Sequence, residues 1–110
     1  MLDRSIEIHN YVDTQGNPTG GIAKGVGVTI HWQNGPLGRD GNRQSPNGAF
    51  VETVLYVAMT RLEFYQEASG GRFACWYNKV AINLIRAALE ILNQRTIDRE
   101  SRKVEGTHEA

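Results

Sequence analysis

The fold is decided by residues 48–67, which read GAFVETVLYVAMTRLEFYQE, and by residues 74–102, which read ACWYNKVAINLIRAALEILNQRTIDRESR. In both stretches apolar residues recur every three or four positions, which is the period of an amphipathic helix. Ser69-Gly70-Gly71 stands between them and permits a tight reversal of the chain. The sequence therefore predicts two long helices, about Gly48–Glu67 and Ala74–Arg102, paired as an antiparallel hairpin.

The first helix carries more apolar surface than one partner helix covers. One stripe contains Val51, Leu55, Ala58, Leu62 and Tyr65, and a second stripe beside it contains Phe50, Val54, Val57 and Phe64. The second helix has an apolar face made of Ala81, Ile82, Ile85, Ala88, Leu89 and Leu92. Because a packed neighbour covers one such stripe, the surplus predicts that the hairpin pairs with further copies of the chain.

Residues 1–46 differ from the helical part, since glycine is dense and apolar residues alternate with small or polar ones. This period of two predicts strands at Ser5–Val12 and Ile22–Gln33, joined by a turn-rich connection. A polar loop follows and ends at Pro46, after which Asn47 is predicted to cap the first helix.

The predicted fold class is therefore α+β. A small N-terminal antiparallel β-sheet with its loop occupies residues 1–46, and the helical hairpin with an irregular C-terminal tail occupies residues 47–110. Two strands alone are marginally stable, so the sheet is expected to need the helices or another subunit.

The composition excludes several functional classes. Lys and Arg number 12, as do Asp and Glu, so the net charge is zero, whereas general nucleic-acid binding requires a basic excess. No apolar run approaches the roughly 20 residues that span a bilayer, and Met1–Asn10 is too polar for a secretion signal. The lone Cys75 is expected to be a buried thiol in a reducing compartment. We therefore expect a soluble intracellular protein that binds neither nucleic acid nor membrane.

No catalytic or metal site is predicted. His9, His31 and His108 lie far apart in the sequence, and none belongs to a pair with the spacing of zinc ligands. Cys75 has no neighbouring His or Asp to activate it as a nucleophile. The acidic residues of the helices, such as Glu63 and Glu67, are spaced as surface groups that face solvent or a basic partner. We expect no enzyme activity and no cofactor.

Two arginines near the end of the second helix point to a ligand. Arg95 and Arg99 lie four positions apart and therefore project from one helix face. They continue a stripe in steps of seven that starts at Asn78 and passes through Ile85 and Leu92. Guanidinium groups suit phosphate oxygens. Two interpretations stay open: a solvated helix end, or a site for a small anionic ligand.

Helix geometry constrains such a site. Asn78 and Arg95 are 17 residues apart, which is about 25 Å along a straight helix. A ligand the size of a nucleotide does not span that distance easily within one subunit. If both residues contact the same ligand, they come from different chains of an oligomer.

A series of short motifs, in this order and spacing, resembles the phage Thoeris anti-defence (Tad) sponge family, in its first described group. The motifs are Trp32-Gln33-Asn34-Gly35-Pro36, Asn47-Gly48-Ala49 with Glu52, Arg61-Leu62, Phe73-Ala74-Cys75 with Asn78, Leu92, Arg95-Thr96, Arg99 and Val104-Glu105-Gly106-Thr107. They span about residues 28–107. The related anti-CBASS cyclic-nucleotide sponges share the helical hairpin but not the sheet.

The resemblance implies binding without catalysis. Such proteins bind cyclic ADP-ribose isomers made by bacterial TIR-domain enzymes in the host cytoplasm and sequester them intact, so that the defence effector stays inactive. Some members also bind cyclic di- or trinucleotides at separate sites of a hexamer. For this chain a homo-oligomer between dimer and hexamer is expected. The alternative from a different class is an oligomeric structural or scaffolding phage protein without a ligand.

The resemblance also implies roles for individual residues. Asn78 would bind a base edge or a ribose hydroxyl, while Arg95 and Arg99 would bind the pyrophosphate. An aromatic ring near the hairpin tip would stack on adenine, and three candidates stay open. These candidates are Phe64, Tyr65 and Phe73. Three further residues could close the pocket: Gln33, Asn34 and Thr107.

Overall fold

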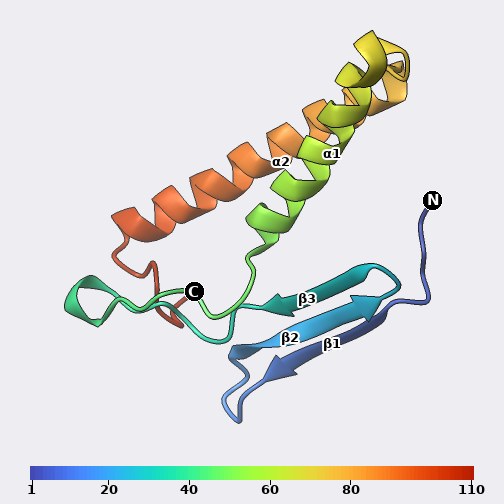
Figure 1. The fold of residues 1–110 in the computed structure, drawn as a ribbon. Helices are drawn as coiled ribbons and strands as arrows, with labels where there is room; N and C mark the ends of the chain where they lie inside the picture. The colour runs from blue at the N-terminus through green and yellow to red at the C-terminus, as the bar shows by residue number, and fades with distance from the viewer. The chain divides into compact units, whose positions relative to one another are not determined.

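The structure is a computed structural model that describes residues 1–110, and the chain forms two compact units. The sheet unit contains Met1–Phe50 and Arg102–Ala110, and the hairpin unit contains Val51–Ser101. A three-stranded antiparallel sheet precedes two helices, so the predicted α+β class is confirmed (Figure 1). Neither helix combines the length and the apolar character needed to cross a membrane.

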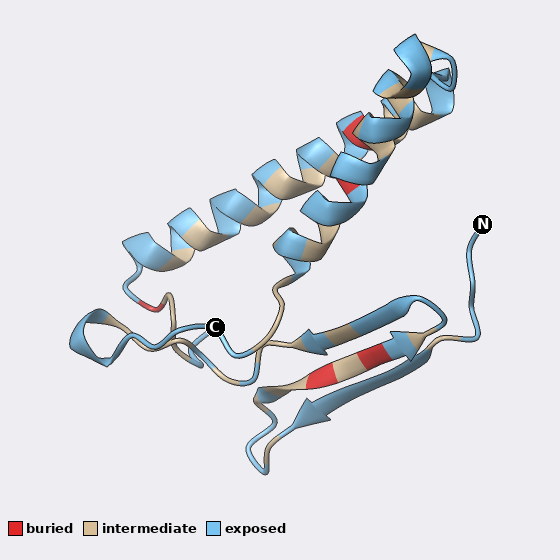
Figure 2. Ribbon diagram, viewed as in Figure 1, coloured by how far each residue is buried: buried red, intermediate tan, exposed pale blue.

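The sheet contains β1 (Glu7–Val12), β2 (Pro18–Gly25) and β3 (Val28–Trp32), in that spatial order. Ala23 of the central strand pairs with Ile8 on one side and with Ile30 on the other. Hydrogen bonds on both sides cover the backbone of β2, and its residues include the buried ones of the sheet (Figure 2).

The prediction of one long strand over Ile22–Gln33 was wrong, because a tight turn divides it into parts of β2 and β3. Gly25 pairs with Val28, so Val26 and Gly27 form a two-residue hairpin turn. Gly27 has a φ of 74°, which glycine adopts without steric cost. Val26 is 95% exposed, although its place in the alternation assigned it to a strand face.

Asp13 organises the loop between β1 and β2. Its carboxylate accepts hydrogen bonds from the backbone N–H of Gln15 at 2.8 Å and from that of Asn17 at 2.9 Å. The pKa of Asp13 is lowered from its usual 3.8, mainly because the backbone N–H of Asn17 donates to the charged form. The ionised carboxylate therefore stabilises this hairpin.

We expect Asp13→Ala to lower the thermal midpoint of unfolding at neutral pH. Because the folded-state pKa lies below 3.8, the stabilisation is complete above that pH and disappears as the pH falls through the lowered value. Circular dichroism melts should therefore show a difference from the unmodified chain that shrinks in acid. Thr14→Ala, in the same loop, is the control. A difference that persists unchanged in acid would contradict this role.

The segment before the first helix adds a short parallel bridge beside β3. The N–H of Ala49 donates to the carbonyl of His31 at 2.7 Å, and the N–H of Gln33 donates to the carbonyl of Ala49 at 2.9 Å. These bonds hold Ala49 in a bridge to β3, and Gly48 lies in a bend directly before it. The first helix therefore starts later than the predicted Gly48, and Asn47 does not cap it.

The hairpin unit consists of α1 (Val51–Gly71) and α2 (Trp76–Ser101) (Figure 1). The backbone leaves helical dihedrals at Ala68, Ser69 and Gly70, so regular helix ends near the predicted residue 67. Cys75 precedes α2 and its sulfur accepts the N–H of Asn78 at 3.5 Å, in the manner of a helix cap. The predicted burial of Cys75 was wrong, because the thiol is exposed at this helix start.

The side chain of Gln66 joins the end of α1 to the start of α2. Its amide donates to the carbonyl of Cys75 at 3.1 Å and accepts the N–H of Cys75 at 2.9 Å. This reciprocal pair satisfies both backbone groups of one residue in the connection. It holds the start of α2 against the end of α1, across the connection in which three residues have non-helical dihedrals.

We expect Gln66→Ala to destabilise the hairpin by roughly 1 kcal/mol, the usual net value of a small set of solvent-accessible hydrogen bonds. The measurement is chemical denaturation followed by helical circular dichroism. Gln94→Ala on the exposed surface of α2 is the matched control, because it makes the same change in helix propensity without these bonds. Equal denaturation midpoints for the two variants would show that the hydrogen bonds of Gln66 to Cys75 do not stabilise the hairpin.

The apolar core of the single chain is small. Its buried apolar residues are Ala23, Met59, Ile82 and Val104. Met59 is the buried residue of α1 and Ile82 is that of α2, and Figure 2 shows one buried position on each helix. Large apolar side chains stay exposed on both units, including Ile8 and Val12 of the sheet and Tyr56 and Val57 of α1. The chain by itself therefore covers only part of its apolar surface.

Candidate ligand-binding site on the helical hairpin

Asn78, Arg95 and Arg99 lie on one uninterrupted helix, α2, which has 26 residues. Asn78 and Arg99 are half-buried, whereas Arg95 is exposed. Since no break shortens the path between them, the separation of about 25 Å between Asn78 and Arg95 holds. The structure does not bring these two residues together within the chain. A site that uses both requires a second copy.

Arg95 is held by an acid of the first helix. Its Nη2 lies 3.2 Å from Oε1 of Glu52, in the first turn of α1. Exposed pairs of this kind contribute about 0–1 kcal/mol. An incoming phosphate, with more charge and more acceptor oxygens, can replace such a carboxylate. The ion pair thus keeps the Arg95 guanidinium near the surface. Little free energy is lost when another anion takes the place of Glu52.

The structure brings two of the three candidate aromatic residues together. Phe64 and Tyr65 have ring centroids 6.0 Å apart, and both rings are exposed on α1. Phe73 lies in the connection between the helices, where the guanidinium of Arg72 stands 5.2 Å from its ring centroid. Phe64 and Tyr65 are therefore placed by regular helix, and Phe73 is placed by a turn.

Gln33 and Asn34 hold their own loop in the sheet unit. The N–H of Asn34 donates to Oδ1 of Asn47 at 2.8 Å, and Nδ2 of Asn47 donates back to the carbonyl of Asn34 at 3.1 Å. Oε1 of Gln33 accepts the N–H of Asn47 at 2.9 Å. These hydrogen bonds stabilise the loop, which the sequence did not indicate. The role of Gln33 and Asn34 in ligand binding stays a prediction.

The tail is irregular but ordered by hydrogen bonds to the loop of residues 37–44. The N–H of Gly38 donates to the carbonyl of Gly106 at 2.9 Å, and Nη1 of Arg43 donates to both carboxylate oxygens of Glu105, at 2.8 and 2.7 Å. The hydroxyl of Thr107 donates to the carbonyl of Val104 at 2.5 Å within the tail. No local pattern in the sequence indicates the contacts between the tail and the loop, because their partners are more than 60 residues apart.

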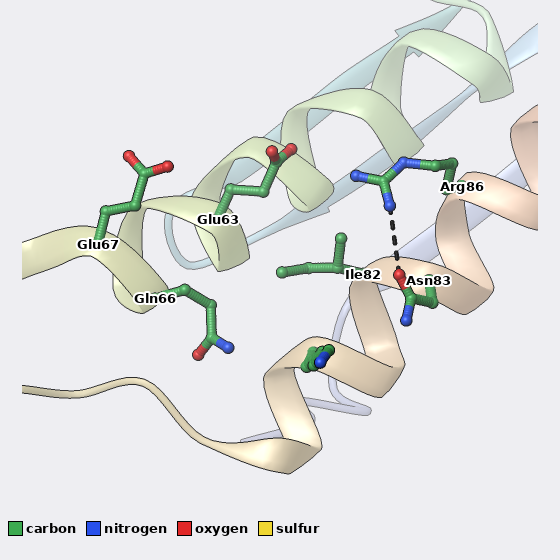
Figure 3. A pocket seen from close by; sticks show the side chains of 7 residues that line it. Glu63, Gln66, Glu67, Ile82, Asn83 and Arg86 are labelled. Atoms are coloured by element: carbon green, nitrogen blue, oxygen red, sulfur yellow. Dashed lines mark hydrogen bonds between the residues drawn. The ribbon is translucent and has the colours of Figure 1, made fainter. Parts of the chain in front are cut away.

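A cavity of about 220 Å³ lies between α1 and α2 (Figure 3). Its lining residues are Glu63, Gln66, Glu67, Lys79, Ile82, Asn83 and Arg86. None of these residues was among the predicted site residues. Two acids come from α1 and two basic residues from α2, so the charges of the lining balance. Glu63 and Glu67 thus line the same cavity as Lys79 and Arg86 of the neighbouring helix.

The cavity is small, and six of its seven lining residues are charged or carry an amide. Nη1 of Arg86 donates to Oδ1 of Asn83 at 3.2 Å, which orients the guanidinium along one side (Figure 3). Typical ligand pockets measure about 300–1,000 Å³ and are mostly apolar. The cavity is therefore less suited to a nucleotide than an interface between chains would be. No three His, Cys, Asp or Glu side chains in the structure are grouped so that they could hold a metal ion.

Comparison with known proteins identifies a relative. No model of a known protein family matches the chain. A search of curated proteins finds Thoeris anti-defense 1 of Bacillus phage SBSphiJ7, which is 40% identical over 82 residues, or 74% of this chain. The chain belongs to the Thoeris anti-defence family. The family expected from the short motifs is thereby confirmed.

The match has a limited extent on the side of the relative. The aligned part covers 53% of Thoeris anti-defense 1, so the chain spans about half the length of the curated relative it matches. The fold of the Thoeris anti-defence chain and its family are thus established.

Proposed function

We propose that this Thoeris anti-defence chain is a phage protein that binds a cyclic ADP-ribose-type immune signal in the host cytoplasm and sequesters it without degradation. Removal of the signal keeps the Thoeris effector inactive. Cyclic di- and trinucleotides are a second ligand class that the same protein could take at separate sites, with an effect on CBASS defence. The chain supplies no catalytic step in this function.

The observation that carries the proposal is the family relationship, since the relative at 40% identity is named for anti-defence against Thoeris. The arginines of α2 supply the chemistry that such a ligand needs. Arg95 and Arg99 lie one helical turn apart, and two guanidinium groups at that spacing can bind the two phosphates of a pyrophosphate. Asn78 at the other end of α2 would reach the same ligand from a second chain.

Exposed apolar surface on α2 supports an oligomer with sites between its chains. Tyr77, Leu84 and Ile91 follow one another in steps of seven and are 78%, 66% and 69% exposed. Large apolar side chains exposed along one helix face are typical of a protein interface. Cover by a second hairpin would also bury a ligand between chains, and burial slows its release. We therefore place the ligand at a homo-oligomer interface.

The test is a release assay. The protein is incubated with glycocyclic ADP-ribose, freed of excess ligand by gel filtration, and heated, and the released compound is analysed by chromatography and mass spectrometry. Release of the intact compound is expected. An altered product would mean an enzyme. If no cyclic nucleotide is retained, the protein is the oligomeric scaffold that remains as the alternative.

A further inference from the structure

One turn of α1 carries a guanidinium and two aromatic rings in mutual contact. Arg61, Phe64 and Tyr65 stand at positions i, i+3 and i+4, which face the same side of a helix. The Cζ of Arg61 lies 5.0 Å from the centroid of the Phe64 ring and 4.9 Å from that of Tyr65. Nε of Arg61 donates a hydrogen bond to the hydroxyl of Tyr65 at 3.2 Å. The three side chains thus form one cluster, which we call the Arg61 cluster.

The charge of Arg61 has no carboxylate partner. Arg61 takes part in neither the ion pair of Arg43 with Glu105 nor that of Arg95 with Glu52. Only Nε of Arg61 is engaged, by Tyr65, so its two terminal nitrogens keep their donors for a ligand. This pair of parallel donors matches two oxygens of a phosphate. The aromatic faces offset part of the charge without replacing an anion.

The two rings supply a surface for a base. Phe64 is 53% exposed and Tyr65 is 39% exposed, and their planes are inclined at 56°. Because every nucleobase has a flat π-face, exposed aromatic side chains beside a cation are a recurrent way to hold a nucleotide. The hydrogen bond from Arg61 limits the rotation of the Tyr65 side chain before any ligand arrives.

Phe73, the third candidate aromatic residue, is positioned less firmly for stacking than Phe64 and Tyr65. Phe73 follows the backbone break at Ser69 and Gly70, and the neighbouring Arg72 makes a contact with its ring but no hydrogen bond. Binding groups on regular helix are placed more reproducibly than groups on a turn. The choice among Phe64, Tyr65 and Phe73 therefore favours the pair on α1.

We propose that the Arg61 cluster is a nucleotide-binding element, in which Arg61 binds a phosphate oxygen of the ligand and orients Tyr65, and the rings of Phe64 and Tyr65 stack on the base. The inference rests on the proposed function, since it concerns the same cyclic nucleotide. It adds Arg61 to the residues that bind the ligand and assigns it two tasks, direct contact with the anion and positioning of an aromatic ring.

The experiment measures the affinity of the full-length chain for glycocyclic ADP-ribose by isothermal titration calorimetry. Arg61→Ala is expected to weaken binding about 10- to 100-fold, the usual effect of losing a charge-assisted hydrogen-bonded pair. Arg61→Lys keeps the charge but loses the planar fork, so it should recover only part of the affinity. Arg72→Ala is the matched control, because it removes an equivalent charge and ring contact from Phe73.

Further readouts separate ligand contact from a structural role. Binding by the unmodified chain should weaken with added salt, and this salt dependence should be smaller in Arg61→Ala. Tyr65→Phe, which removes only the hydroxyl, should weaken binding modestly and leave the salt dependence unchanged. Inorganic pyrophosphate should compete with the ligand in the unmodified chain and less well in Arg61→Ala. The mass of the oligomer should stay the same in all variants.

Two kinds of failure can be told apart. If the unmodified chain retains the ligand and Arg61→Ala binds it equally well, the Arg61 cluster is not part of the site and the proposed function stands. Equal losses of affinity in Arg61→Ala and Arg72→Ala would likewise overturn the assignment, since the loss would then come from the lower net positive charge and not from a specific contact. If the unmodified chain binds no cyclic nucleotide, both the proposed function and this inference fall.

Discussion

Replacement of both Arg95 and Arg99 by alanine is expected to abolish the retention of cyclic ADP-ribose. Hydrogen bonds to charged groups contribute about 1.5–3 kcal/mol each, so the loss of two guanidinium groups should weaken binding by roughly 10²–10⁴-fold. A complex weakened that far dissociates during gel filtration. The measurement is the amount of intact ligand that heating releases from the variant.

The same variant should keep its fold and its oligomer mass. Arg95 is exposed and its partner Glu52 lies 3.2 Å away, in a pair worth about 0–1 kcal/mol. Neither arginine belongs to the buried core of Met59 and Ile82. Light scattering should therefore give the mass of the unmodified protein. A change in that mass would assign the arginines to assembly instead.

A second double variant tests where on the hairpin the ligand lies. Lys79→Ala with Arg86→Ala removes the same formal charge from the cavity between α1 and α2. If the ligand is bound by the end of α2, this variant should retain it. Full retention by the Arg95 and Arg99 variant, together with loss in the cavity variant, would move the site to the cavity.

The helices could be predicted because their signals are local. The apolar period of α1 ends at the place where Ser69 and Gly70 adopt positive φ values of 53° and 69°. The start of α1 was missed by three residues, because Ala49 bonds to His31 and Gln33 of a distant segment. A contact between segments of this kind has no local signature in the sequence.

The division of β2 from β3 shows a different limit. Apolar residues alternate through Val26 and Val28, so the pattern continues across the turn without interruption. A two-residue turn needs only a residue that tolerates positive φ, and Gly27 provides it. In a glycine-rich strand such a residue does not stand out. The alternation therefore predicted the strands but not the point of reversal.

The candidate site was predictable in part. Sequence spacing placed Asn78, Arg95 and Arg99 on one helix, and α2 confirms that placement. It did not indicate that Nε of Arg61 bonds to Tyr65, since side-chain orientation decides that contact. Whether Asn78 and Arg95 meet across an interface stays a prediction, because it depends on how two chains pair.

Gly48→Ala is expected to destabilise the sheet unit strongly. A Cβ at this position would lie 2.6 Å from both the carbonyl carbon and the oxygen of Trp32, and 2.7 Å from the nitrogen of Gln33. All three are backbone atoms held by the bridge between Trp32 and Ala49, so none can rotate away. Overpacking of this kind costs about 1–3 kcal/mol, and loss of the bridge would add to it.

Gly41→Ala is the matched control for this prediction. A Cβ there meets no atom within 4 Å, and the φ of Gly41 lies outside the left-handed region. The substitution lowers only the entropy of the unfolded chain, so it should leave stability unchanged or raise it slightly. Urea denaturation, followed by tryptophan fluorescence in a Trp76→Phe background so that only Trp32 contributes, should therefore separate the two variants clearly. Equal midpoints would mean that residues 47–49 do not pack against β3, and the late start of α1 would then need another cause.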